Sequence, residues 1–492
     1  MLSLYSVLLC LVCLLVAPLT PLLLLWGPFR RGLLQRLGLL PRVLRDQAWM
    51  SEGCLWVHAA SLGEVNAVAP VVRELLPRIP RQALVVTCTS LAGREQARRV
   101  FPQAAACLLL PLDLPFLLAP WIRRFRPRLL LVAETEWWPN LLHQMKIHGA
   151  QVLVANGRLT ERSGRRYARL GNFFAAVLED VDLFAMQARE DADRVISLGA
   201  RPARVLVAGN TKFDVSADLE SARSGATALR RVLGWPSGDP VLVAGSTRPG
   251  EEAPLLAAFA VLKKALPGAR LVLAPRHLER VPAVEAVLRA GRRRWVSRTS
   301  GESAQDAEVL LLDTLGELRA FYALAREAGA AWVGGSFRDF GGQNPLEAAA
   351  LGVPVLFGPF MRHFPEVAEV LLAGGGARQA AVEDLGRVSV TLLSDAGARR
   401  AAGLAAEVCV RARAGASKAT AELGWKLLLV AHMVAQGQVW RGEGVESFRS
   451  VSESGGAAQD PDWRDDGRGQ VLPARGFGVS LGRGDGGDEL ER

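Results

Sequence analysis

Residues 332–359 read WVGGSFRDFGGQNPLEAAALGVPVLFGP, and they predict a strand, a glycine loop, a helix and a second strand. Asn344 followed by Pro345 is typical of a helix N-cap with proline at the first helical position. A helix beginning there directs unpaired N–H groups and its positive dipole end at the loop, which predicts a phosphate or carboxylate site. Glu347 suits either a capping box or a bond to a ribose hydroxyl group.

Short apolar runs recur on both sides of the polar stretch 216–238. They lack period-2 alternation, as is typical of strands buried on both faces of a parallel sheet. The runs are LWVHAAS (55–61), ALVVTCTS (83–90), CLLLPL (107–112), RLLLVAETE (128–136), QVLVANGR (151–158), LFAMQ (183–187), VLVAGNT (205–211), VLVAGSTR (241–248), RLVLAPRH (270–277), VLLLDT (309–314), AAWVGGS (330–336) and VPVLFGP (353–359). This rhythm predicts an α/β fold of two doubly wound Rossmann-like domains, with functional loops at the carboxyl ends of their strands facing a central cleft.

The N-terminal segment Leu2–Trp26 carries no charged residue and has about the length needed to cross a bilayer. The basic residues follow it, at Arg30, Arg31, Arg36, Arg42 and Arg45. A cleavable signal peptide has the opposite order, so we predict a membrane-anchor helix with its C-terminal side in the cytoplasm. A helix buried on the protein or lying in the membrane interface stays open as an alternative, because Pro18 and Pro21 interrupt the run.

Composition narrows the class of protein. The chain has 492 residues, too many for one core, and its 50% hydrophobic and 22% charged residues are typical of a folded protein. Six scattered cysteines indicate neither a disulfide framework nor a zinc site. A net charge of +10 and a pI near 9.8 suit work against anionic phospholipid, and the stretch 29–44, FRRGLLQRLGLLPRVL, predicts a basic helix lying on that surface. No nucleic-acid motif occurs in the sequence.

Several charged residues stand where predicted strands end. Glu64 follows the first strand at the start of a helix, Glu134 and Glu136 end the strand of 128–136, and Lys212 follows 205–211. Acids at the end of a buried strand are costly unless they are paired, hydrogen-bonded or functional. A dipole partner for Glu64 and a solvated lysine are the plain alternatives.

The second half offers groups suited to a nucleotide. The turn 245–252 is rich in hydroxyl groups, Pro275 and Arg276 end the next strand, and Gly316–Leu318 opens a helix. The dinucleotide fingerprint G-x-G-x-x-G is absent after the first strand of either half, which argues against a nicotinamide enzyme. These loops also lack an Asp-x-Asp pair, so no metal cofactor is expected.

Taken together, the motifs resemble the 3-deoxy-D-manno-octulosonic acid (Kdo) transferases of lipopolysaccharide assembly, membrane-anchored enzymes of the glycosyltransferase-B fold. The resemblance spans residues 1–435 and rests on AASLGE (59–64), ETEWWPN (134–140), NGR (156–158), GNTKFD (209–214), GSTRPGEE (245–252), PRH (275–277), GGS (334–336), GGQNPLE (341–347) and PVLFGP (354–359). It implies an inverting transfer of Kdo from CMP-Kdo to a lipid A precursor, lipid IVA, at the cytoplasmic face of the inner membrane.

The resemblance also implies roles for individual residues. Glu64 matches the family's general base, and Glu134 and Lys212 match residues that support the transition state. The CMP contacts fall on Pro275, Arg276, Gly316, Glu317, Leu318, Gly342, Gln343, Asn344 and Glu347. Arg248 and Gln343 stand where related sequences commonly have histidine.

The resulting organisation is an anchor at 1–28, an acceptor-binding domain at 29–215, a linker at 216–238 and a CMP-Kdo-binding domain at 239–395. C-terminal helices at 396–438 are expected to pack back on the first domain, and the glycine-rich tail 439–492 is expected to be disordered. Two alternatives remain: a glycosyltransferase-B enzyme that uses a UDP-sugar, and a catalytically silent glycolipid-binding scaffold. The presence of Glu64, Glu134 and Lys212 together favours an enzyme.

Overall fold

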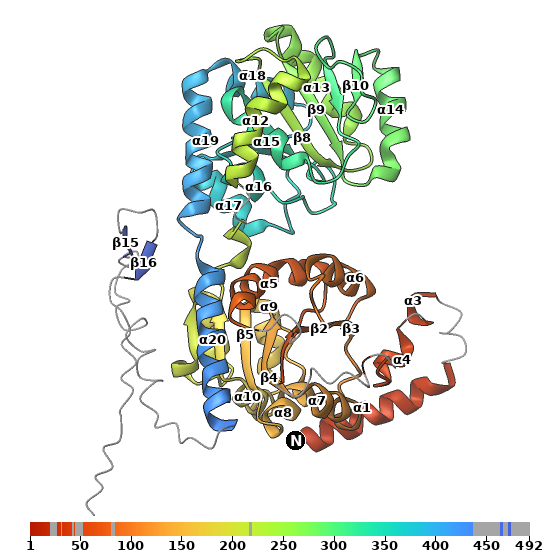
Figure 1. Cartoon of the computed structure of the whole chain (residues 1–492), viewed down its shortest axis with the longest axis vertical. Coiled ribbons are helices and arrows are strands. Elements are labelled where there is room, and N and C mark those ends of the chain that lie inside the picture. The colour runs from red at the N-terminus through yellow and green to blue at the C-terminus, as the bar shows by residue number, and fades with distance from the viewer. Residues whose placement is uncertain are drawn as a thin grey trace, which may run out of the picture. The chain divides into compact units, whose positions relative to one another are not determined.

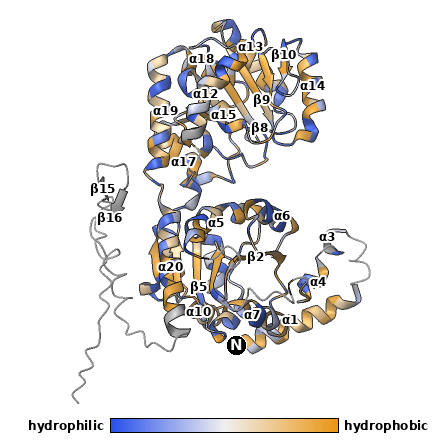
Figure 2. Ribbon diagram, in the orientation of Figure 1, coloured by the Kyte–Doolittle hydropathy of each residue, from blue (hydrophilic) through white to orange (hydrophobic). Residues whose placement is uncertain are grey.

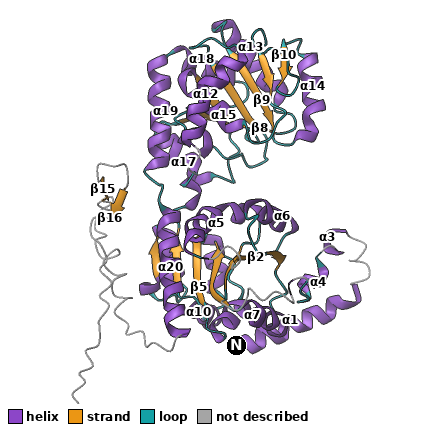
Figure 3. Cartoon of the chain, in the orientation of Figure 1, coloured by secondary structure: helices purple, strands orange, loops and turns teal. Residues whose placement is uncertain are grey.

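The computed structural model describes residues 1–19, 27–30, 32–41, 44, 53–79, 84–215, 219–435, 463–465 and 471–473. Its main elements are two seven-stranded parallel sheets, each flanked by helices (Figures 1 and 3). Strands of this kind are apolar on both faces because helices cover both sides of the sheet. The predicted α/β fold with two doubly wound sheets is therefore confirmed.

The first sheet has the strand order β3-β2-β1-β4-β5-β6-β7. Its strands are β1 (Cys54–His58), β2 (Leu84–Cys88), β3 (Ala106–Leu109), β4 (Pro127–Ala133), β5 (Gln151–Gly157), β6 (Leu183–Met186) and β7 (Val205–Val207). The helices between them are α5 (Leu62–Leu75), α6 (Leu91–Val100), α7 (Pro115–Phe125), α8 (Pro139–Ile147), α9 (Glu161–Ala168), α10 (Asn172–Glu179) and α11 (Arg189–Ser197). The chain runs outward from β1 to β3 and then returns to the other side of β1, so the order reverses between β1 and β4. In doubly wound sheets ligands bind at such a reversal.

The second sheet has the order β10-β11-β9-β8-β12-β13-β14 and reverses between β8 and β12. Its strands are β8 (Val241–Thr247), β9 (Arg270–Pro275), β10 (Trp295–Ser297), β11 (Val309–Leu311), β12 (Gly329–Val333), β13 (Val355–Phe357) and β14 (Ala377–Gln379). The accompanying helices are α13 (Glu252–Ala265), α14 (Val281–Ala290), α15 (Leu318–Ala328), α16 (Leu346–Ala350), α17 (Pro365–Ala373) and α18 (Leu385–Ser394). Each of the twelve predicted runs overlaps a strand, whereas the edge strands β10 and β14 were not predicted.

The stretch 216–238 contains a helix, α12 (Leu219–Leu233). Its small and apolar residues Ala222, Ala226, Leu229 and Leu233 recur at helical spacing and pack against the core of the second sheet. The stretch predicted as a linker thus contains a helix packed on the second sheet, and alanines form much of its apolar face.

Two long helices close the chain's main body. Helix α19 (Ala396–Arg411) contributes Ala406 and Val410 to the second sheet's core, and α20 (Ala416–Ala435) contributes Ala421 and Leu427 to the first. In α19 the buried Glu407 pairs with three arginines from three helices: Arg223 at 3.0 Å, Arg326 at 3.2 Å and Arg411 at 2.6 Å. This cluster fastens α12 and α15 to α19.

The start of α20 is capped by Asp214, the last residue of GNTKFD. Its Oδ2 accepts a hydrogen bond from Ser417 N at 2.6 Å, and its Oδ1 accepts one from Gly415 N. A carboxylate is favoured at a helix N-terminus by the unpaired N–H groups and by the dipole. Phe213, one residue earlier, is buried in the core of the second sheet.

The N-terminal helix α1 (Leu2–Val16) packs on the first domain through polar contacts. Tyr5 Oη donates to Asp113 Oδ2 at 3.1 Å, and Ser6 Oγ donates to Asn140 Oδ1 at 3.0 Å. Apolar side chains on other faces of α1 are exposed, with Leu4, Leu11 and Leu15 at 62%, 55% and 79%. Figure 2 shows that most of α1 is hydrophobic.

Among the described residues, no helix has both the length and the apolar character that crossing a membrane requires. Residues 20–26 of the predicted anchor, together with Arg31, Arg42 and Arg45, lie outside the described residues. The continuous basic helix expected at 29–44 was wrong: the described part holds the four-residue helices α3 (Gly27–Arg30) and α4 (Leu33–Arg36). Gly38, with φ of 77°, turns the chain directly after α4.

Residues 439–492 form a separate unit. The tail expected to be disordered lies outside the described residues except for β15 (Trp463–Asp465) and β16 (Val471–Pro473), which pair in antiparallel fashion. This pair was not predicted.

Candidate active site

Glu64 lies at the reversal point of the first sheet, in the first turn of α5, the helix that follows β1. Ser61 caps α5, its Oγ accepting from Glu64 N at 3.4 Å, and the carboxylate turns back to accept from Ala60 N at 2.7 Å and from Ser61 Oγ at 3.0 Å. Burial raises the pKa of the Glu64 carboxyl group to about 7, and the charges of Glu136 and Glu134 act in the same direction. A carboxyl group with a pKa near 7 is suited to general-base catalysis at neutral pH.

Glu134 and Lys212 come together on the other side of this reversal point. Lys212 Nζ lies 3.7 Å from Glu134 Oε1. Glu134 has a left-handed backbone, with φ of 49°, and its amide donates to Ala155 O at 3.0 Å. A residue other than glycine held in this conformation is strained, and such strain gathers at functional sites.

The turn that carries Lys212 is fixed by neighbouring groups. Asn210 Oδ1 accepts from Lys212 N at 3.0 Å, while Asn210 Nδ2 donates to Glu366 Oε2 in the first turn of α17 at 2.7 Å. Thr211 N donates to Asn156 Oδ1 at 3.0 Å. Asn156 itself has a left-handed backbone, with φ of 54°. This network gives the NGR and GNTKFD segments a shared structural role.

Two further residues of this cluster, His58 and Glu136, were not singled out as site residues from the sequence. His58 is fully buried at the end of β1, with Nδ1 3.0 Å from Thr87 Oγ1 and Nε2 3.6 Å from Glu136 Oε2. Trp138 Nε1 donates to the same Glu136 oxygen at 3.0 Å. A histidine inside an otherwise apolar strand was the available signal, because a buried imidazole requires polar partners.

At the reversal point of the second sheet, the glycine-loop amides already have an acceptor. The carboxylate of the buried Glu251 accepts from the backbone amides of Gly335 (2.7 Å), Ser336 (3.0 Å) and Phe337 (3.1 Å), and from Arg248 N (2.8 Å). These N–H groups are therefore already hydrogen-bonded within the protein.

The helix start after this loop also differs from the prediction. Helix α16 begins at Leu346 with Pro345 at its N-cap position, and it has only five residues. Asn344 Oδ1 accepts from Leu346 N at 3.0 Å, so the asparagine closes a local turn one residue before the observed N-cap. Glu347 Oε1 lies 3.9 Å from Arg319 Nη2 in α15.

Cationic side chains gather beside the glycine loop. Arg248 Nη1 lies 2.9 Å from His277 Nε2, and because arginine only donates, that nitrogen is the acceptor. Burial and the neighbouring charge of Arg276 lower the pKa of the Arg248 guanidinium group. A Cβ added to Gly335, whose φ is 71°, would lie 3.4 Å from both Arg248 Cγ and Gln343 Nε2, so both side chains lie beside this glycine.

The other predicted nucleotide contacts follow β9 and β11. Arg276 is exposed after Pro275, and its amide donates to Thr247 O at 3.1 Å. Gly316, with φ of 89°, precedes Glu317, whose Oε1 accepts from Arg298 Nε at 3.2 Å and Nη2 at 3.0 Å. Leu318 begins α15. Within the described ranges, no group of three His, Cys, Asp or Glu side chains is arranged to hold a metal ion.

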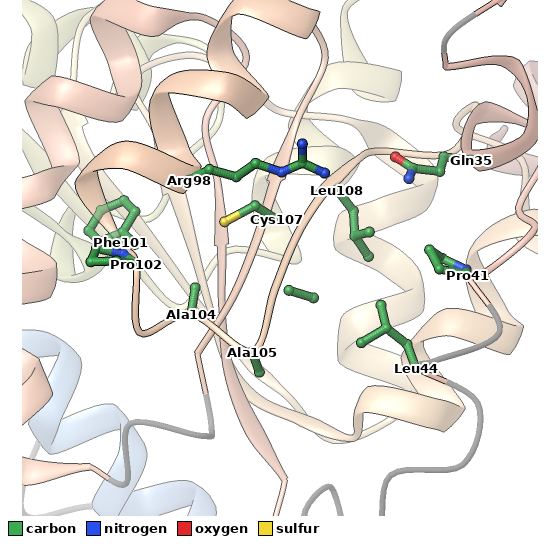
Figure 4. A pocket seen from close by; sticks show the side chains of 11 residues that line it. Gln35, Pro41, Leu44, Arg98, Phe101, Pro102, Ala104, Ala105, Cys107 and Leu108 are labelled. Carbon is green, nitrogen blue, oxygen red and sulfur yellow. The ribbon is translucent and has the colours of Figure 1, made fainter.

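A cavity of about 490 Å³ lies elsewhere, at the amino end of the edge strand β3 (Figure 4). Its lining includes Leu44, Arg98, Phe101, Cys107 and Leu108. None of the predicted site residues lines this cavity. We therefore place the candidate active site at the strand ends, where the acids, the lysine and the arginines lie together, and not in the cavity.

Residues 31–215 match the family model described as 3-Deoxy-D-manno-octulosonic-acid transferase (kdotransferase). The chain is 33% identical over 319 residues to 3-deoxy-D-manno-octulosonic acid transferase of Haemophilus influenzae, covering 65% of this chain and 73% of that one. It is 34% identical over 378 residues to the protein of the same name from Bordetella pertussis, covering 74% and 85%. UDP-GlcNAc 2-epimerase from Neisseria meningitidis, solved with UDP-GlcNAc, shares the fold, with a TM-score of 0.51, 16% identity and coverage of 77% of this chain and 99% of that one. The chain thus belongs to the 3-deoxy-D-manno-octulosonic acid transferase family and is a glycosyltransferase.

Proposed function

We propose that this enzyme transfers Kdo from CMP-Kdo to a hydroxyl group of a lipid A precursor, lipid IVA, with inversion at the anomeric carbon. The observation that carries the proposal is the placement of Glu64 at the reversal point of the first sheet, with a pKa raised to about 7 by burial. At neutral pH a large fraction of this carboxyl group is ionised yet basic enough to accept a proton from a sugar hydroxyl group.

In the proposed reaction, Glu64 takes the hydroxyl proton while the acceptor oxygen forms a bond to the anomeric carbon of Kdo. The bond from that carbon to the phosphate oxygen of CMP breaks, and its electron pair leaves with CMP. Attack from the face opposite the phosphate gives inversion. Ala60 N and Ser61 Oγ fix the orientation of the carboxylate during this step.

In the same step, Lys212 provides a positive charge, and Glu134 orients its ammonium group. Positive charge placed in advance stabilises negative charge that develops in the transition state. The ammonium group of Lys212 is oriented by Glu134 at 3.7 Å and by a turn whose backbone is fixed by Asn210. We assign it to the developing charge of the leaving phosphate.

On the donor side, Arg248 and Arg276 are the groups that we assign to the anionic part of CMP-Kdo. The loop amides of residues 335–337 are excluded from this role because Glu251 already accepts from them. Guanidinium groups bind phosphate and carboxylate through charge-assisted bonds. No resident metal ion is required by this assignment.

We also propose that the enzyme works at the cytoplasmic face of the inner membrane. The exposed apolar side chains of α1 and the net charge of +10 support attachment to an anionic bilayer. The acceptor's acyl chains would be held in the same surface.

Mass spectrometry of lipid IVA incubated with the protein and freshly made CMP-Kdo tests the proposal. We expect a product heavier by one or more Kdo residues, competition by free CMP but not by UDP, and far less product with Glu64→Gln. A UDP-sugar enzyme would show the reverse competition. Unmodified lipid IVA in the presence of a folded protein would contradict the proposed reaction.

A further inference from the structure

Glu251 connects the two loops that flank the reversal point of the second sheet. It lies between β8 and α13, whereas three of its four hydrogen-bond donors lie in the loop after β12, 84 to 86 residues away. Oε2 accepts from Arg248 N and Gly335 N, and Oε1 accepts from Ser336 N and Phe337 N. Each oxygen therefore holds two amides, and the side chain is fully buried.

The bonds continue from this loop to the segment predicted to contact the nucleotide. Gly335 O accepts from Gly342 N at 2.9 Å, and Gly334 O accepts from Gln343 N at 3.0 Å. Ser336 Oγ accepts from Gly358 N at 2.9 Å, which adds the loop after β13. A single carboxylate thus organises the loops after β8, β12 and β13.

Burying a carboxylate is costly, and four charge-assisted bonds offset that cost. The four hydrogen bonds that Glu251 accepts all come from loop amides, and the charge of the nearby Arg248 also acts on this carboxylate. Concave sets of backbone N–H groups of this kind are anion sites. Here the protein fills the site with its own side chain.

We infer that Glu251 is a positioning residue for donor binding: its carboxylate occupies the anion site of the glycine loop and thereby places Arg248 and Gly342–Asn344 for the nucleotide. This inference rests on the proposed function for the identity of the nucleotide. A positioning role of Glu251 can be distinguished from a purely structural one, because loss of its carboxylate should weaken donor binding more than acceptor binding.

Glu251→Gln is the principal test variant. Gln keeps the shape of the side chain but places an NH₂ group against two backbone N–H donors, so two amides lose their acceptor. Glu252→Gln is the matched control, since Glu252 is also buried at the same helix start but binds Arg280 Nη1 at 2.8 Å and Thr247 Oγ1 at 2.9 Å.

The first measurement is amide hydrogen exchange without ligand, which does not depend on the donor's identity. We expect residues 334–343 to exchange faster in Glu251→Gln and to remain as in the wild type in Glu252→Gln. The second is titration with CMP, together with the KM values for CMP-Kdo and lipid IVA. We expect CMP binding weaker by about tenfold or more and a higher donor KM, with the acceptor KM unchanged.

Acetate should partly restore CMP binding to Glu251→Ala, because it replaces the deleted carboxylate and the adjoining carbon. If Glu251→Gln does not fold, Glu251→Asp, which keeps the charge but shortens its reach, takes its place in both measurements. Unchanged exchange at 334–343, or CMP affinity within twofold of the wild type in a folded variant, would overturn the inference. Failure of the wild type to bind CMP would instead count against the proposed donor, while the exchange result would still decide the role of Glu251.

Discussion

Replacing Glu64 with glutamine should greatly reduce the turnover of the protein and, above neutral pH, make it more stable. The pKa of Glu64 is raised from 4.5 to about 7, chiefly by burial, so the folded state prefers the protonated carboxyl group. Because the folded pKa lies above the unfolded one, the wild type loses stability as pH rises from about 4.5 to about 7. Glutamine is neutral throughout and avoids this loss.

The size of the effect follows from the shift. A difference of about 2.5 pKa units, at about 1.36 kcal/mol each, gives an upper limit of about 3.4 kcal/mol. The carboxyl group is partly exposed, so solvent screening reduces this to about 1–2 kcal/mol. We expect Glu64→Gln to exceed the wild type in free energy of unfolding by that amount at pH 8 and to match it near pH 4.5.

Urea unfolding at both pH values, combined with a pH–rate profile, is the assay. The wild-type kcat/KM should rise through about pH 7 and then level off, while the variant should lose roughly 10²- to 10⁴-fold in turnover. Glu74→Gln, an exposed change on the same helix, is the control and should alter neither quantity. Equal stability of the variant and the wild type at pH 8 would refute the burial argument, and near wild-type turnover would refute the role of base.

Lys212→Met should reduce turnover by about 10²-fold while CMP affinity measured by calorimetry stays unchanged, since the ammonium group acts on developing charge. Glu136→Gln should move the rise of the pH–rate profile to lower pH, because it removes a negative charge that raises the pKa of Glu64; an unmoved profile would exclude this coupling. Arg276→Ala should weaken CMP binding by about 1.5–3 kcal/mol, checked by the same calorimetry. Glu407→Gln should lower the free energy of unfolding by about 2–4 kcal/mol in urea, because it leaves three arginines without their shared carboxylate.

The central strands were predictable because a strand that is buried on both faces has apolar side chains at consecutive positions, which form an unbroken apolar run in the sequence. The edge strands were not: β10 (Trp295–Ser297) is only half-buried, and Arg378 and Gln379 of β14 are exposed. At an edge, backbone pairing with a single neighbour forms a strand without requiring apolar side chains.

The location of a single charged residue after a strand was predictable from the sequence, as for Glu64, Glu134 and Lys212. What escaped prediction depends on residues distant in sequence. Glu251 belongs to the motif GSTRPGEE (245–252), but three of the amides that it binds lie 84 to 86 residues later in the chain. Backbone donors have no signature in side-chain identity, so the occupied anion site appears only in the folded chain.

The contribution of α20 to the first core bears on synthesis of the chain. Helix α20 packs against α5, β4 and β5, with Ala421 and Leu427 in the core there, and a Cβ at Gly424 would lie 3.4 Å from Leu75 and Leu153. On the ribosome, the first sheet must therefore wait for about 200 further residues after β7, or on the order of 10–40 s of elongation, before its last covering helix exists. During that interval an apolar face of the nascent domain is open to chaperones and to neighbouring chains.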